Sequence, residues 1–81
     1  MQRISGKTDD AGHLVAIGAA LRQYRTDHGW SQEELAHATG IDRSHMGRIE
    51  RGERNLTILN LIRIAAALNC PPSKLLRLAG M

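Results

Sequence analysis

The segment from Ser31 to Gly52, SQEELAHATGIDRSHMGRIERG, constrains the fold of this chain most, because it predicts two short helices joined by a glycine turn. Ser31 and Glu34 have the spacing of a capping box, in which a hydroxyl and a carboxylate each accept a hydrogen bond from a backbone N–H at the helix start. A helix should therefore begin at Gln32. It should end at about Gly40, because glycine readily takes the left-handed conformation that terminates helices.

A second helix should follow Asp42, a good capping residue, and run through about Arg51. Side chains advance by about 100° per residue, so Met46 and Ile49 share one face and should pack inward together with Ile41. The opposite face carries Arg43, Ser44, Gly47, Arg48 and Arg51. Most charged helix faces are simply solvated. A glycine costs about 1 kcal/mol relative to alanine within a helix, however, and is easier to understand if a partner approaches the backbone closely. This face favours a helix that lies in the major groove of DNA.

The remaining sequence predicts three more helices and no strand. Apolar residues recur at helical spacing within 13–28, Thr57 can cap a helix that ends at Leu68 or Asn69, and a short helix follows the Pro71–Pro72 break over 73–78. The side chains expected to face inward from the second and fourth helices are Leu35, Ala36, Ala38, Ile58, Leu61, Ile64, Ala65 and Leu68. Residues 1–12 are polar and are expected to form a flexible arm, so that 13–81 make one domain.

Composition favours a small binding module over an enzyme. The chain has 81 residues, 11 basic against 8 acidic, and a formal charge of +3, which suits an acidic partner such as nucleic acid. Its four histidines lack metal-ligand spacing, no nucleophile has an adjacent base and no glycine-rich phosphate loop is present, so no metal, cofactor or small-molecule ligand is expected. One cysteine and no long apolar run indicate a cytoplasmic protein without a disulfide or membrane span.

These motifs resemble the helix-turn-helix class of Cro and lambda-type repressors, also called the xenobiotic-response-element family. The resemblance covers about residues 14–78 and is carried by LRQYR, GWSQEELA, TGID and IERGERN. The run DRSHMGRIERGERNLTILNLIRIAAAL is most similar to small restriction-modification controller proteins, which are dimeric transcription regulators. The resemblance implies a compact five-helix, lambda-repressor-like fold with helices two and three as the helix-turn-helix. It also implies that Arg25 and Glu50 form an internal ion pair.

A division of DNA contacts follows from the chemistry of the side chains. Phosphate contacts position a protein on the duplex, whereas contacts with base edges specify sequence. The residues expected to bind phosphate are Gln32, at a helix N-terminus, and Arg51, Arg54, Asn55 and Arg22. The residues expected to read bases are Arg43, Ser44, Gly47 and Arg48, on the helix spanning 43–51.

One short reading helix seldom gives useful specificity, so a homodimer on a palindromic operator is expected. Surplus apolar residues near the C-terminus are candidates for the dimer interface: Leu59, Ile62, Leu76 and Leu78. The same residues could instead complete the monomer core. An alternative function is a protein-interaction module, such as an antitoxin whose C-terminal leucines bind a partner protein.

Overall fold

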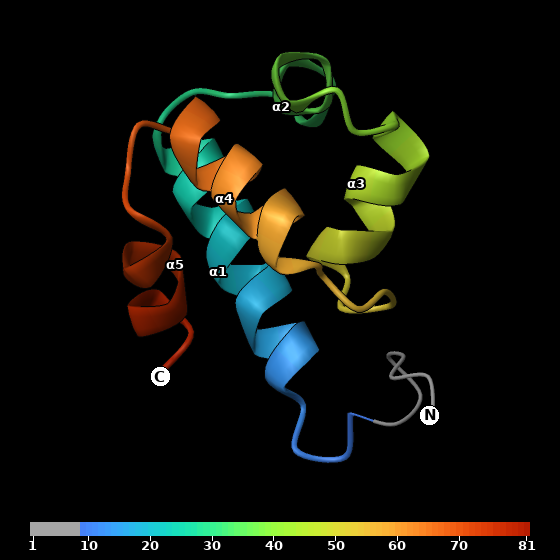
Figure 1. Ribbon diagram of the computed structural model, residues 1–81, viewed down its shortest axis with the longest axis vertical. Coiled ribbons are helices and arrows are strands. Elements are labelled where there is room, and N and C mark those ends of the chain that lie inside the picture. The colour runs from blue at the N-terminus through green and yellow to red at the C-terminus, as the bar shows by residue number, and fades with distance from the viewer. Residues whose placement is uncertain (1–8) are drawn as a thin grey trace.

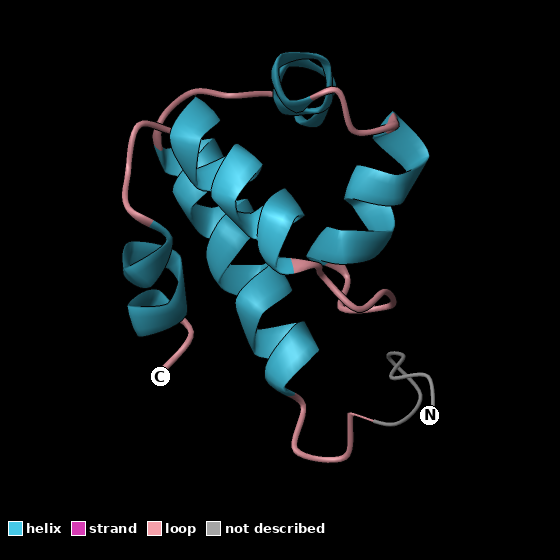
Figure 2. Cartoon of the chain, in the orientation of Figure 1, coloured by secondary structure: helices cyan, strands magenta, loops and turns pink. Residues whose placement is uncertain are grey.

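The computed structural model describes residues 9–81, and within that range it contains five α-helices and no strand. The helices are α1 (His13–Asp27), α2 (Gln32–Thr39), α3 (Arg43–Glu50), α4 (Ile58–Ala67) and α5 (Pro72–Leu78), connected by short loops (Figures 1 and 2). The expected all-α fold is therefore confirmed. The helix ends lie close to the capping and breaking residues that predicted them.

The residues before α1 include a capping turn. Both carboxylate oxygens of Asp9 accept hydrogen bonds from the start of α1, Oδ1 from His13 N at 2.9 Å and Oδ2 from Leu14 N at 2.7 Å. The Gly12 amide also donates to the Asp9 carbonyl at 3.0 Å. Residues 9–12, which belong to the expected arm, therefore help to define the start of α1. The rest of the expected arm, residues 1–8, lies outside the described residues.

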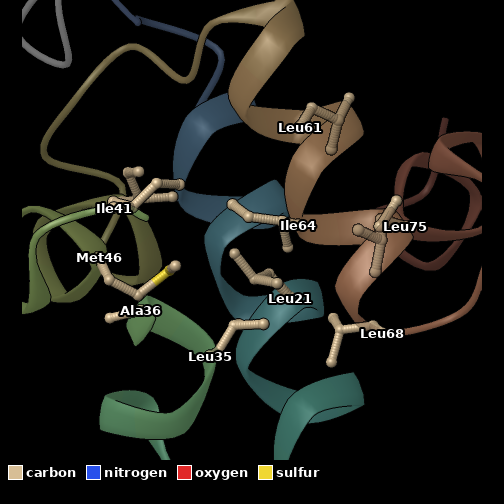
Figure 3. Packing of buried hydrophobic residues seen from close by; sticks show 11 residues of the cluster. Leu21, Leu35, Ala36, Ile41, Met46, Leu61, Ile64, Leu68 and Leu75 are labelled. Atoms are coloured by element: carbon tan, nitrogen blue, oxygen red, sulfur yellow. The ribbon is translucent and has the colours of Figure 1, made fainter. Parts of the chain in front are cut away.

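All five helices contribute to the hydrophobic core, and α3, which supplies Met46 and Ile49, packs against α1 and α2. Leu21, Leu35 and Ile64, from α1, α2 and α4, converge at its centre (Figure 3). The buried cluster is Leu21, Leu35, Ala36, Ile41, Met46, Ile49, Leu61, Ile64, Ala65, Leu68 and Leu75. Because α3 and α5 lie on opposite sides of the molecule, the face of α3 that points away from the core is left uncovered by α5 (Figure 1).

A close backbone approach fixes α3 on α1. A Cβ atom on Gly18 of α1 would lie 2.5 Å from the carbonyl oxygens of both Ile49 and Glu50 at the end of α3. Such contacts cannot be made by a residue with a side chain, so Gly18 allows the two helices to touch. This role of Gly18 was not predicted from the sequence, because it depends on a residue 31 positions away.

Two expected core residues are not in the core. Ile58 is 70% exposed, because it is the first residue of α4 and extends past the core-facing stripe that starts at Leu61. Ala38 is exposed because it lies two residues, or about 200°, from the buried Ala36 on the short helix α2. The two errors have different causes: a helical pattern does not show where the neighbouring helices end, which misplaced Ile58, whereas Ala38 lies on the opposite side of α2 from Ala36.

Candidate nucleic-acid interface

The turn between α2 and α3 has the geometry that its residues predicted. Gly40 takes a left-handed φ of 73°, and the Ile41 amide donates to the Ala36 carbonyl at 3.1 Å. The Ile41 side chain is buried against the core. At the start of α2 the capping box is complete, because the side chains of Ser31 and Glu34 each accept a hydrogen bond from the other residue's backbone N–H. The turn is therefore held by local bonds at both ends of α2, which sets the position of α3.

The two faces of α3 have opposite character. Met46 and Ile49 are buried, whereas Arg43, Ser44 and Arg48 are exposed on the other side of the helix. Arg43 lies beside Glu33 of α2, with Nε 3.6 Å from Oε1, and both side chains remain mostly in solvent. The guanidinium groups at positions 43 and 48 are therefore free to approach an external anion or base edge.

Ser44 is committed in part to the start of α3. Its hydroxyl donates to Asp42 Oδ2 at 2.6 Å, and its backbone N–H donates to the same oxygen at 3.1 Å. The hydroxyl bond, together with the backbone bonds from His45 and Ser44, lowers the pKa of the Asp42 carboxyl. Because its proton is used, the Ser44 hydroxyl has only its lone pairs left for a further hydrogen bond.

Gly47, where a close approach of a partner to the backbone was expected, is covered by side chains of the same chain. It is buried, and a Cβ atom there would lie 3.2 Å from Arg51 Nη1 and 3.4 Å from Gln32 Oε1. The side chains of α2 and of the end of α3 thus close over it. Its missing side chain makes room for Gln32 and Arg51, not directly for a base.

A buried network connects α1, α2 and α3. Arg25 donates to both oxygens of Glu50, from Nε at 2.7 Å and from Nη2 at 2.9 Å, so the expected ion pair is present. Arg25 Nη1 also donates to the Trp30 carbonyl at 2.9 Å. Gln32 Nε2 donates to Glu50 Oε1 at 3.0 Å, which fixes the amide of this expected phosphate ligand. Glu50 therefore holds the fold and also orients the side chain of Gln32.

The other expected phosphate ligands are exposed. Arg51 ends α3, Arg54 and Asn55 lie in the loop that follows, and Arg22 lies on α1. Arg51 donates to the carboxylate of Glu53 from Nε at 2.8 Å and from Nη2 at 3.3 Å. These bonds raise the pKa of Arg51. The charges of Arg48 and Arg54 also act on this carboxylate, although of these three arginines only Arg51 forms an ion pair with it.

Glu33 and Glu53 were missed as members of this surface by sequence reasoning. Each pairs with an arginine that was expected to bind DNA, namely Arg43 and Arg51. The signal was present for Glu53, which lies between Arg51 and Arg54 in the run RGER. This run was interpreted from its positive charges alone.

The described residues 9–81 contain no group of histidine, cysteine and acidic side chains placed to bind a metal ion. Within the same range, no helix is long and apolar enough to cross a bilayer.

Comparison with known proteins decides the family. The family model described as "Helix-turn-helix" matches residues 21–75, which is more than half of the chain. The chain belongs to the helix-turn-helix family. The matched range includes α2, the turn and α3, and also Arg25 and Glu50.

Relatives in this family include restriction-modification controllers, as the sequence predicted. The chain is 44% identical to the control protein C.SmaI of Serratia marcescens, over 75% of this chain and 73% of that protein. The crystal structure of the restriction-modification controller protein C.AhdI from Aeromonas hydrophila superimposes with a TM-score of 0.75 at 47% identity, covering 76% of this chain and 94% of that one. The expectation that the protein is not an enzyme agrees with these relatives, which are control proteins.

A third relative was solved with its ligand. The biofilm master regulator SinR in complex with DNA superimposes with a TM-score of 0.69 at 36% identity, covering 74% of this chain and 97% of that one. SinR is a regulator of Bacillus subtilis. Some other relatives are longer proteins, one of which this chain covers over only 31% of its length.

Proposed function

We propose that this protein is a transcription regulator that binds double-stranded DNA sequence-specifically as a homodimer on a palindromic operator. The observation that carries the proposal is the polarity of α3, whose apolar side chains are buried while Arg43, Ser44 and Arg48 face solvent. An α-helix with such a face fits the major groove, where an arginine fork recognises the O6 and N7 atoms of guanine. The likeness to SinR, solved with DNA, supports the same function.

The proposed DNA contacts fall into two groups, those with base edges and those with phosphates. In this proposal Arg43 and Arg48 donate to base edges and Ser44 accepts from them, so these three residues set the sequence preference. Gln32, Arg51, Arg54, Asn55 and Arg22 contact phosphates and set the affinity and its salt dependence. Gly47 has no contact of its own with a base. It serves recognition indirectly, by leaving space for Gln32 and Arg51.

The proposed dimer interface uses the outer face of α4 and the end of α5. Leu59 is 66% exposed, Ile62 46% and Leu78 51%, and the exposed Ile58 extends the same face of α4. Leu76, which was also expected in the interface, is half-buried and packs against the monomer core. Its contribution to a dimer is therefore limited to its exposed part.

Two measurements test the proposal. Selection of bound fragments from random double-stranded DNA should enrich two inverted half-sites about one helical turn, roughly 34 Å, apart. Native mass spectrometry should detect a dimer without DNA and a dimer on the selected fragment. Failure to enrich any sequence would reject the function.

The same mass measurement separates the alternative. A protein-interaction module whose apolar face awaits a different partner, such as the toxin of an antitoxin pair, should be monomeric alone. The exposed α4 face is compatible with both functions, so a monomer that also enriches no DNA sequence would favour the interaction module.

A further inference from the structure

A carboxylate lies among the arginines that are proposed to grip the DNA backbone. Arg51 contacts Glu53 at two points, with Nε 2.8 Å from Oε2 and Nη2 3.3 Å from Oε1. The two side chains are 59% and 53% exposed, so the pair forms on an open surface that an external anion can reach.

Glu53 is ionised at neutral pH and is influenced by more than one arginine. The hydrogen bonds from Arg51 are the main cause that lowers the pKa of the Glu53 carboxyl, and the charges of Arg51, Arg48 and Arg54 lower it further. The negative charge of Glu53 is therefore paired with Arg51 and is acted on by the charges of Arg48 and Arg54. A phosphate that approached these arginines would meet the carboxylate as well as the guanidinium groups.

Carboxylate and phosphate offer a guanidinium the same two-oxygen edge, which accepts two parallel N–H bonds. The two nitrogens that Arg51 directs to Glu53, Nε and Nη2, form one of the two edges with which a guanidinium can bind a phosphate at two points, and they share Nη2 with the other edge. The remaining nitrogen, Nη1, lies on the other side, 3.2 Å from where a Cβ of Gly47 would stand.

Resting on the proposed DNA-binding function, we propose that Glu53 is an internal competitor of the DNA phosphate for Arg51. By occupying Arg51 it limits the affinity for the DNA backbone, and it does so for every sequence. Removing the Glu53 carboxylate should therefore raise the affinity for DNA. Removing a residue that orients Arg51 for binding would lower that affinity, so the two roles can be distinguished.

The direct test replaces Glu53 with glutamine and measures dissociation constants on two duplexes of equal length, the selected fragment and an unrelated sequence. Exposed ion pairs are weak, so the Glu53→Gln variant should bind both duplexes about two- to fivefold more tightly, by the same factor. The slope of log affinity against log salt should steepen by up to about one unit.

A charge-matched control separates local competition from net charge. Asp27→Asn removes one negative charge at the end of α1, where the carboxylate accepts from Gln23 Nε2 at 2.7 Å and is remote in sequence from α3. This variant should gain clearly less affinity than Glu53→Gln. Thermal unfolding of each variant checks that the fold is retained.

A double variant identifies the arginine involved. If Glu53 acts by occupying Arg51, most of the gain from Glu53→Gln should disappear when Arg51→Ala is already present, because the two changes then are not additive. A full gain in that background would show that Arg51 is not the group being competed for and would overturn the proposal.

The other outcomes are equally decisive. Weaker binding by Glu53→Gln would mean that the carboxylate orients Arg51, and an equal gain from Asp27→Asn would mean that only net charge matters; both would overturn the proposal. A gain on the selected fragment alone would place Glu53 against a base and also overturn it. Failure of the unaltered protein to bind either duplex would instead reject the DNA-binding function itself.

Discussion

Arg25 and Glu50, 25 residues apart, form a buried two-point ion pair in which both carboxylate oxygens accept from one guanidinium. Side-chain exposure is 9% for Arg25 and 2% for Glu50. The Trp30 carbonyl and the Gln32 amide complete the hydrogen bonding of the two groups. A buried pair that is satisfied in this way fixes α3 on α1 in one arrangement, and loss of either partner leaves a buried charge without compensation.

Replacing Arg25 with alanine should therefore lower the free energy of unfolding by about 3 to 5 kcal/mol, measured by urea denaturation. Arg22→Ala on the exposed side of the same helix is the control and should change stability by no more than about 0.5 kcal/mol. Similar losses for the two variants would show that the pair does not hold α3.

The two mid-helix glycines Gly18 and Gly47 should respond to alanine with opposite signs. Gly18→Ala should destabilise by about 1 to 3 kcal/mol, because the new Cβ meets two backbone carbonyls at 2.5 Å. Gly47→Ala meets only the ends of flexible side chains, so the gain in helix propensity should stabilise the protein by up to about 1 kcal/mol. Its DNA affinity should nevertheless fall, because Gln32 and Arg51 are displaced. Thermal unfolding and DNA titration of both variants test these expectations. Destabilisation by Gly47→Ala would contradict the prediction.

Two arginine substitutions should separate base reading from backbone contact. Arg43→Ala should relax the preference for one sequence and cost about 1 to 3 kcal/mol on the selected fragment, because a two-point contact with a base is lost. Arg54→Ala should weaken binding to all sequences alike and reduce the salt slope by about one unit. Titrations of both variants at several salt concentrations against two duplexes check this, and identical behaviour would mean that the assigned roles are wrong.

A charge on the outer face of α4 should break the proposed dimer. Ile62→Glu places a carboxylate in the interface and should shift the protein to monomer in sedimentation measurements, with weaker operator binding. Val15→Glu is the control, because Val15 is 56% exposed but lies on α1. Retention of the dimer by the Ile62 variant would exclude this face as the interface.

Acid should weaken the start of α2 through its capping box. Bonds from the Ser31 backbone and hydroxyl lower the pKa of the Glu34 carboxyl from its ordinary value of 4.5. The ionised Glu34 carboxylate therefore stabilises the folded protein above pH 4.5, its ordinary pKa. This stabilisation is lost as the pH falls below 4.5 and passes the lower pKa that Glu34 has in the folded protein. Glu34→Gln keeps an acceptor for the Ser31 amide without a titrating group, so its melting temperature should fall less than that of the unaltered protein between about pH 6 and about pH 3. Parallel loss in both proteins would exclude this carboxyl as a source of acid sensitivity.

Local signals predicted the helices because their ends are set by neighbouring residues. The capping box at Ser31, the left-handed Gly40 and the cap at Asp42 all act within four residues of where they stand in the chain. The polarity of α3 was equally predictable, since the period of the helix and the buried Met46 and Ile49 leave one face for Arg43 and Arg48.

The features that the sequence did not predict depend on residues distant in the chain. On a helical wheel of α3, Gly47 lies on the polar face, but the side chain of Gln32, 15 residues earlier, covers it. Ile58 fits the inward stripe of α4 but projects beyond the helices that would bury it. The pairing of Glu53 with Arg51 is close in sequence but was missed because the run was judged by its net charge alone.

The Glu50 carboxylate pairs with Arg25 in the interior and also accepts a hydrogen bond from the Gln32 amide. A substitution at Glu50 that weakens the packing of α3 also releases the amide of Gln32, a proposed phosphate ligand, so one change affects both the fold and the proposed DNA contact. Arg43 and Arg48, in contrast, are not needed to hold the fold. In the proposed mode of DNA recognition, these two exposed side chains can therefore change the preferred sequence without loss of the fold.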